Sequence, residues 1–134
     1  MPAPGGVTVR RSVPPDLPFV AADPVLFHHI LVNLIDNGLR HARSEVRVAA
    51  ARDGGAIVLR IEDDGPGVPA AERARVFERF ARGEAEDRRQ GSGLGLAIVK
   101  GFADAMGMLV DLDAAPSGGA RFALRMQASA AAAA

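Results

Sequence analysis

Hydrophobic and polar positions follow two different periods along the chain, and the changes of period divide it into elements. A period near 3.6 follows Asp23-Pro24, where Asp can cap a helix and Pro suits its first turn. We expect this first helix to end between Leu39 and Ala42. The apolar positions that define it are Leu26, Phe27, Ile30, Leu31, Leu34 and Ile35. A short helix is predicted over residues 69–80, and a third from residue 93 to about residue 106.

Alternation with a period of two predicts five strands, over residues 7–13, 46–50, 57–61, 109–113 and 121–126. The turn Asp53-Gly-Gly55 should join the second and third strands as a hairpin. The order of elements predicts an α+β fold, a two-layer α/β sandwich with about three helices on one face of a mixed five-stranded sheet.

Length and composition favour one globular domain without a charge-driven partner. The 134 residues suit a single domain, expected over 7–127, with disordered tails over 1–6 and 128–134. Sixteen basic and 16 acidic residues cancel, which does not favour nucleic acid or a membrane surface. There is no Cys for disulfides or thiolate metal sites, and no apolar run of the roughly 20 residues that span a bilayer. We expect a cytoplasmic, monomeric fragment of a longer parent protein, which could itself be anchored in the inner membrane.

The first helix carries a polar stripe on an otherwise apolar segment. Asn33 and Asn37 lie four residues apart, with His29 and His41 extending the same stripe in both directions. Buried amides need polar partners, and an amide oxygen can ligate Mg²⁺, which usually shares its ligands with phosphate. The alternative is the solvent-exposed face of an amphipathic helix.

Two glycine-containing segments are candidates for ligand binding. Asp63-Asp-Gly-Pro-Gly67 follows an apolar strand, so a carboxylate there could accept a hydrogen bond from an amine such as adenine N6. A surface turn is the alternative. Gly91-Ser-Gly-Leu-Gly-Leu96 opens the third helix, where free N–H groups attract phosphate. It lacks the last glycine of a dinucleotide fingerprint and the Gly-Lys-Ser/Thr of a P-loop.

Taken in order, these segments resemble the conserved boxes of sensor histidine kinases. Asn33-Leu-Ile-Asp-Asn37 resembles the N box and Asp63–Gly67 the first glycine box. Val76-Phe-Glu-Arg-Phe80, extended to Gly83, resembles the F box. Gly91–Gly95 resembles the second glycine box, and Gly118-Gly-Ala-Arg-Phe122 the last glycine motif. The resemblance covers about residues 7–127 and extends to the wider superfamily of gyrase, the mismatch-repair protein MutL and the large heat-shock ATPase chaperones.

The resemblance implies an ATP and Mg²⁺ site between the first helix, the glycine loops and a lid over residues 82–92. Asn37, with Asn33, would bind Mg²⁺. Asp63 would accept a hydrogen bond from the adenine amino group, with Gly67 making room for the base. Arg40 and Arg82 would be the catalytic cations, beside Asn37. The nucleotide contacts implied in this way are Asn33, Asn37, Arg40, His41, Asp63, Gly65, Gly67, Val68, Phe80, Gly91, Ser92, Gly93, Leu94, Gly95 and Leu96.

Three positions depart from the family pattern. His41 stands where a Tyr often stacks on adenine, and Gly38 replaces the usual Ala. His29 stands where the ATP-hydrolysing relatives have a Glu that activates water, which favours phosphotransfer over hydrolysis. The segments Leu26–Leu34 and Phe80–Gly83 most resemble the potassium-responsive sensor kinases.

The sequence therefore predicts an Mg·ATP-binding catalytic domain that donates the γ-phosphoryl group to a histidine on a separate dimerisation domain of the parent kinase. A response regulator would be the downstream partner. None of His28, His29 and His41 is a suitable acceptor, so the isolated chain should not phosphorylate itself. Two alternatives stay open: an ATPase or anti-sigma-type Ser/Thr kinase of the same fold, and a degenerate nucleotide-sensing or docking module.

Overall fold

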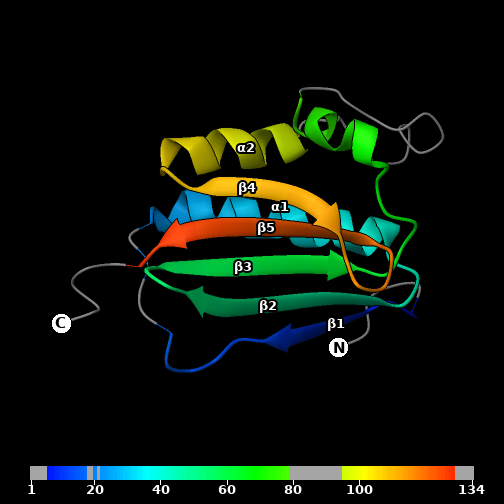
Figure 1. Ribbon diagram of the computed structural model, residues 1–134, viewed down its shortest axis with the longest axis horizontal. Coiled ribbons are helices and arrows are strands. Elements are labelled where there is room, and N and C mark those ends of the chain that lie inside the picture. The colour runs from blue at the N-terminus through cyan, green and yellow to red at the C-terminus, as the bar shows by residue number, and fades with distance from the viewer. Residues whose placement is uncertain (1–5, 18–19, 21, 79–94, 129–134) are drawn as a thin grey trace.

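A computed structural model describes residues 6–17, 20, 22–78 and 95–128 as an α/β sandwich (Figure 1). The elements in chain order are β1 (Thr8–Ser12), α1 (Pro24–His41), β2 (Glu45–Asp53), β3 (Ala56–Asp63), the 3₁₀ helix η2 (Ala70–Phe77), α2 (Gly95–Ala105), β4 (Leu109–Ala114) and β5 (Ala120–Gln127). The predicted fold class is confirmed. Within the short helix expected over residues 69–80, residues 70–77 take the tighter 3₁₀ form instead of an α-helix.

The five strands form one sheet in the order β1-β2-β3-β5-β4. β1 runs parallel to β2, and the other three pairs are antiparallel, so the sheet is mixed as predicted. β2 and β3 form the expected hairpin, with Asp53 opposite Ala56. Ala128, one residue beyond the expected domain end, forms an isolated bridge with Val20 and donates its N–H to the Gly55 carbonyl over 3.0 Å.

Helix α1 begins where the sequence predicts and passes close to the sheet. The Asp23 carboxylate accepts hydrogen bonds from the N–H groups of Val25 and Leu26 at 2.9 and 3.2 Å, which caps the helix. Near the other end, Gly38 lies so close to β2 that a Cβ there would be 3.3 Å from both Val46 methyl groups. The glycine at position 38 therefore allows close packing, for which its low helix propensity is the cost.

The core lies between the helices and one face of the sheet. Successive side chains of a strand point to opposite faces, so Ile57, Leu59 and Ile61 of β3 all face the helices and are buried. They pack with Ile30 and Leu34 of α1. Other buried members of the same core are Val46, Val99, Ala103, Val110, Phe122, Leu124 and Met126. Asp63 continues the row of β3 side chains that includes Ile61, which places a carboxylate at the end of the core.

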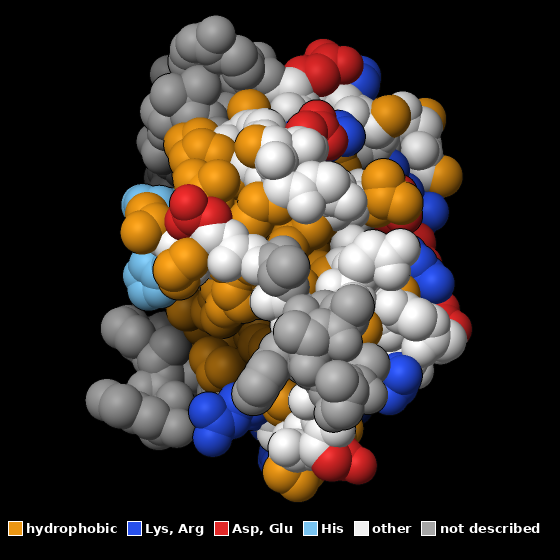
Figure 2. Space-filling view, turned by 90° about the vertical axis from the view of Figure 1, so that its left-hand side faces the viewer, with side chains coloured by type: hydrophobic (Ala, Val, Ile, Leu, Met, Phe, Trp, Pro, Cys, Tyr) orange, Lys and Arg blue, Asp and Glu red, His pale blue; other side chains and the backbone are white. Residues whose placement is uncertain are grey.

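The other face of the sheet carries ion pairs, and Val58 of β3, which points to this face, is nevertheless buried. Glu45 contacts Arg10 at 2.6 Å and Arg47 at 3.0 Å, and Arg121 forms a two-point pair with Asp113 at 2.9 Å for each bond. Figure 2 shows this face from the side, with basic and acidic side chains along its right-hand edge and hydrophobic ones towards the helices. Such exposed pairs contribute little each, about 0–1 kcal/mol, but they keep this face polar.

Four segments meet at one end of the molecule, on the right in Figure 1. They are the end of α1, the end of β3, the turn between β4 and β5, and the beginning of α2. The antiparallel order of β3, β5 and β4 brings the first glycine box next to the last glycine motif. In the described part of the chain, no helix has the length and apolar character needed to cross a membrane.

Candidate nucleotide site

Asp63 is the one buried charged or polar side chain in the described part of the chain, with 4% of its surface exposed. Its Oδ1 atom accepts hydrogen bonds from the N–H of Gly65 at 2.9 Å and from the N–H of Ala120 at 3.3 Å. No donor among the described residues forms a hydrogen bond with the second oxygen, Oδ2. A buried acceptor without a partner is unfavourable by about 1–3 kcal/mol, so this oxygen is suited to a donor from a ligand.

The backbone around Asp63 is packed more closely than any side chain would allow. A Cβ on Gly65 would lie 2.1 Å from the His41 carbonyl oxygen, and a Cβ on Gly119 would lie 2.0 Å from the Asp63 carbonyl oxygen. Gly67 has a positive φ of 77°, and a Cβ there would lie 2.5 Å from the Gly118 carbonyl oxygen. The two glycine motifs therefore interlock, and only glycine fits these three positions.

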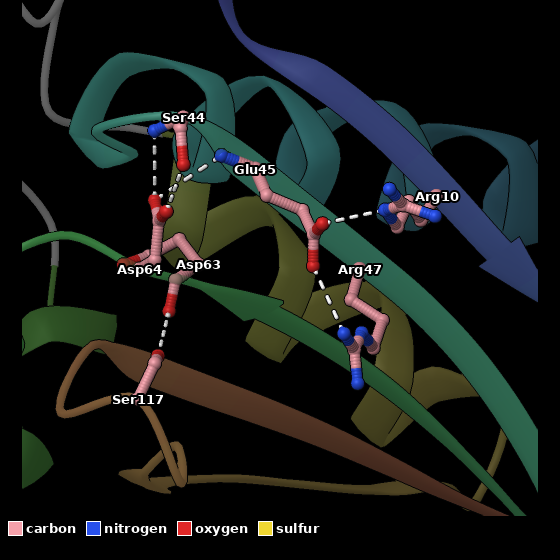
Figure 3. A network of polar contacts seen from close by, with 7 residues as sticks. All are labelled: Arg10, Ser44, Glu45, Arg47, Asp63, Asp64 and Ser117. Carbon is pink, nitrogen blue, oxygen red and sulfur yellow. Dashed lines mark hydrogen bonds and ion pairs between the residues drawn. The ribbon is translucent and has the colours of Figure 1, made fainter.

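The turn between β4 and β5 also holds Asp63 through its backbone. The Ser117 hydroxyl donates a hydrogen bond to the Asp63 carbonyl oxygen at 3.1 Å (Figure 3). Residues 118–122 were predicted as a glycine motif, but no role was predicted for Ser117, Gly119 or the Ala120 N–H. The sequence signal was the pair of glycines after Ser117, whose partner, 54 residues away in the sequence, only the fold reveals.

Helix α1 brings Asn33 to the beginning of α2. The Asn33 amide nitrogen donates to the His29 carbonyl one turn earlier at 2.7 Å, which turns its oxygen away from its own helix. That oxygen, Oδ1, lies 3.0 Å from the position a Cβ of Gly95 would occupy. Gly95 is the first residue of α2, so Asn33 faces the end of the helix that the second glycine box opens.

The remaining predicted residues at the end of α1 lie beside this region. Asn37 is half-buried, and its carbonyl is bonded to the Nδ1 atom of His41 at 2.8 Å. Arg40 forms an ion pair with Asp36, one turn earlier on the helix. Val68 and Leu96 pack against the edge of the core. Phe80, Arg82, Gly91, Ser92, Gly93 and Leu94 lie outside the described residues.

A second carboxylate, next to Asp63, was not predicted to have a role. Asp64 Oδ1 accepts hydrogen bonds from three successive backbone N–H groups, of Arg43 at 2.8 Å, Ser44 at 3.0 Å and Glu45 at 3.2 Å. Its Oδ2 accepts the Ser44 hydroxyl at 2.5 Å (Figure 3). The Ser44 hydroxyl, followed by these N–H groups, holds the pKa of Asp64 far below its ordinary value. We call these four bonds the Asp64 clasp.

The family described as histidine kinase-, DNA gyrase B- and HSP90-like ATPase matches residues 22–130. The chain belongs to this family. Within it, the similar proteins are sensor histidine kinases, so the chain is a histidine kinase ATP-binding catalytic domain, as its five motifs predicted.

Two curated relatives illustrate the similarity. The chain is 45% identical over 105 residues to the signal transduction histidine-protein kinase AfsQ2 of Streptomyces coelicolor, covering 78% of the chain and 20% of AfsQ2. It is 34% identical over 116 residues to the sensor protein KdpD of Escherichia coli, covering 85% of the chain and 13% of KdpD. The chain thus spans a fifth or less of these two relatives, which have long segments without a counterpart here.

Two solved structures have the same fold. The mycobacterial sensor histidine kinase MprB superposes with a TM-score of 0.78 at 32% identity, over 92% of this chain and 83% of that one. Full-length ShkA in complex with AMPPNP also gives a TM-score of 0.78 at 32% identity, over 93% of this chain and 27% of ShkA. The latter protein is therefore a relative seen with an ATP analogue.

The donor set of the described residues fits a shared Mg²⁺ site better than a metal site made by protein alone. In the ranges the structure describes, no group of three or more His, Cys, Asp or Glu could hold a metal ion. Neutral amide oxygens, such as those of Asn33 and Asn37, are hard ligands that can complete a Mg²⁺ shell whose other ligands are phosphates and water.

Proposed function

We propose that the chain binds Mg·ATP at this end of the sandwich and presents the γ-phosphoryl group to a histidine on a separate dimerisation domain of its parent kinase. The proposal rests on how the two oxygens of the Asp63 carboxylate are bonded. Oδ1 accepts hydrogen bonds from two backbone N–H groups. Oδ2 is buried at a turn formed by glycines, and no described residue donates a hydrogen bond to it.

At the adenine end, the open Oδ2 of Asp63 would accept a hydrogen bond from the exocyclic amine. A carboxylate can only accept at neutral pH, so it selects a base with an amine over one with a carbonyl at that position. Gly65 and Gly67 keep side chains away from this position. His41, whose Nδ1 atom is bonded to the Asn37 carbonyl, would stack on the base where relatives often have Tyr.

At the phosphate end, the first turn of α2 would present N–H groups to the phosphates, because the early N–H groups of a helix have no partners within it. Gly95 and Leu96 belong to this turn. Gly91, Ser92, Gly93 and Leu94 would extend it, and Phe80 and Arg82 would contribute from the lid. Arg40 forms an ion pair with Asp36 in the structure, and it would exchange this partner for the phosphates and help neutralise their charge.

Mg²⁺, when bound, would neutralise phosphate charge and fix the geometry of the leaving group. Asn37, assisted by Asn33, would supply its protein ligands. Transfer breaks the bond from the γ-phosphorus to the bridging oxygen and forms a bond from phosphorus to the incoming imidazole nitrogen, with ADP leaving. The chain has only to position the reactants, and His29, which lies edge-on to Phe102 at 5.9 Å, is not needed as a base.

We further propose that residues 7–127 form the ATP-binding domain and that it acts as a monomeric unit of a larger kinase. Its partners would be the dimerisation and phosphoacceptor domain, and through the parent kinase a response regulator. ATP is a cytoplasmic metabolite, so the domain would act in the cytoplasm, without direct contact with nucleic acid or a membrane.

The test is transfer from γ-labelled ATP to a separately purified dimerisation domain of the parent kinase. Three proteins are compared: the unmodified chain, Asp63→Asn, and Asp53→Asn as the matched control, at the end of β2 in the hairpin that precedes β3. We expect the unmodified chain and the control to label the acceptor histidine, and Asp63→Asn not to do so. The chain incubated with ATP alone should stay unlabelled.

Three results would contradict the proposal. Steady release of inorganic phosphate without an acceptor would indicate an ATPase, and labelling of a serine or threonine would indicate a kinase of the anti-sigma type. Binding of ATP without transfer to any supplied acceptor would indicate a nucleotide-sensing or docking module.

A further inference from the structure

We propose that Asp64 is a positioning residue for nucleotide binding, which holds Asp63 in place through the clasp on residues 43–45. This inference rests on the proposed function, since it concerns the orientation of the adenine-binding carboxylate. Figure 3 shows the clasp's bonds from Ser44 and Glu45, which join the beginning of β2 to the end of β3, with Asp63 immediately beside them.

The sheet holds the backbone that precedes Asp63, and the clasp holds the backbone that follows it. Asp63 is the last residue of β3, where it is paired with Val46 of β2. Beyond it the chain must turn so that the Gly65 N–H reaches back to Asp63 Oδ1 at 2.9 Å. Asp64 lies between these two groups, so the four bonds to its carboxylate restrict the torsion angles that set the Asp63–Gly65 geometry.

The same clasp sets the distance between the turn and helix α1. Residues 43–45 follow directly after α1, and the Ser44 carbonyl also accepts the Thr8 N–H at 2.9 Å, which ties β1 to the same point. On the neighbouring side, the His41 carbonyl leaves no space for a side chain on Gly65. Loss of the clasp would let the turn move relative to α1, which carries Asn33 and Asn37.

The two neighbouring carboxylates are bonded in opposite ways. Asp64 has both oxygens occupied by protein donors, four in all. Asp63 has one oxygen occupied and one open among the described residues. This difference predicts opposite responses to the same substitution. Asn at position 64 can still accept the three N–H bonds through its oxygen and contact Ser44 through its amide. Asn at position 63 would instead place a donor opposite the adenine amine, which is itself a donor.

The experiment is titration of ATP with Mg²⁺ into the purified chain by calorimetry, together with amide hydrogen exchange of the nucleotide-free protein. The variants are Asp64→Ala, Asp64→Asn and Ser44→Ala. Asp53→Ala is the matched control, since Asp53 has an exposed ion pair in the hairpin that precedes β3. Ser44→Ala removes one hydroxyl and keeps the N–H groups, so it remains informative if Asp64→Ala does not fold.

We expect Asp64→Ala to weaken ATP binding about tenfold, as the loss of one well-placed charged hydrogen bond would, and Asp64→Asn to restore most of that affinity. Ser44→Ala should weaken binding about threefold, and Asp53→Ala should leave it unchanged. In the nucleotide-free protein, the Gly65 and Ala120 N–H groups should exchange faster in Asp64→Ala than in Asp64→Asn.

Equal affinity of the unmodified chain, Asp64→Ala and Ser44→Ala would overturn the positioning role. So would an Asp64→Asn variant that is folded but binds as weakly as Asp64→Ala, because the charge and not the bonding pattern would then matter. No binding by the unmodified chain would instead contradict the proposed function, and the exchange rates of the Gly65 and Ala120 N–H groups would still decide whether Asp64 positions the turn.

Discussion

The two ends of β3 are built from similar residues and differ in what surrounds them. Asp53-Gly-Gly55 precedes the strand, and Asp63-Asp-Gly-Pro-Gly67 ends and follows it. At the first end, the Asp53 side chain is 64% exposed and pairs with Arg125, and a Cβ on either glycine would meet no atom of the described residues within 4 Å. At the second end, Asp63 is buried and two of the turn's glycines are in contact with other segments.

This difference shows that composition alone does not distinguish a hairpin turn from a binding turn. Either end could be a surface turn on its sequence, and Gly54, with a φ of 61°, even meets the conformational requirement for glycine. What separates them, among the described residues, is how closely the neighbouring segments pack. The second end has α1 on one side and the β4–β5 turn on the other, and a buried carboxylate is tolerated there because backbone donors meet it.

The largest expected effect comes from adding a methyl group at the crowded end. Gly119→Ala would place a Cβ 2.0 Å from the Asp63 carbonyl oxygen, so the β4–β5 turn must move away from Asp63. We expect the unfolding free energy to fall by about 3 kcal/mol, the upper range for overpacking, and ATP binding to be lost. Urea denaturation and calorimetric titration measure the two effects.

The matched substitution at the open end is Gly55→Ala. Gly55 has no positive φ, and no atom in the described part of the chain lies within 4 Å of its Cβ position. Alanine should therefore fit there and raise the unfolding free energy by about 0.5 kcal/mol. A Gly119→Ala variant as stable as Gly55→Ala would show that the two glycine motifs do not interlock.

A smaller effect on the unfolding free energy should appear at acid pH, and it depends on Asp64. The pKa of Asp64 is lowered in the folded protein, so its carboxylate stabilises the fold above the ordinary pKa of an aspartate. That contribution is lost as the pH falls below about 4 towards the folded pKa. We expect the unfolding free energy of the unmodified chain to exceed that of Asp64→Asn by about 1 kcal/mol at pH 7, and the gap to narrow towards pH 3. A gap that widens in acid would contradict this.

The smallest effect is expected for the ion pair at the open end. Arg125 and Asp53 are 2.8 Å apart and about half exposed, so Asp53→Ala should lower the unfolding free energy by no more than about 0.5 kcal/mol. The loss should disappear at high salt, because ions screen exposed pairs. A salt-independent loss above 1 kcal/mol, measured by urea denaturation, would mean that the two ends are less different than their packing indicates.

Much of the fold was predictable from local pattern. The Asp23-Pro24 start of α1 and the alternation in β2 and β3 depend on neighbours in sequence, and local physics determines them. The 3₁₀ form of residues 70–77 was not predictable, because a short helical segment can take either form. Of the site, the family motifs indicated Asp63 and its glycines, but the Ser117 and Asp64 contacts join residues about 20 to 54 positions apart and appear only with the fold.

The role of the Asp63 carboxylate is best tested by calorimetric titration of ATP into the purified chain, with and without Mg²⁺, beside Asp63→Asn and its control Asp53→Asn. We expect binding by the chain and by the control, and a loss of at least about 100-fold in Asp63→Asn, since a buried donor would then face the adenine amine. Equal binding by Asp63→Asn and the unmodified chain would mean that the open oxygen of Asp63 does not receive the nucleotide.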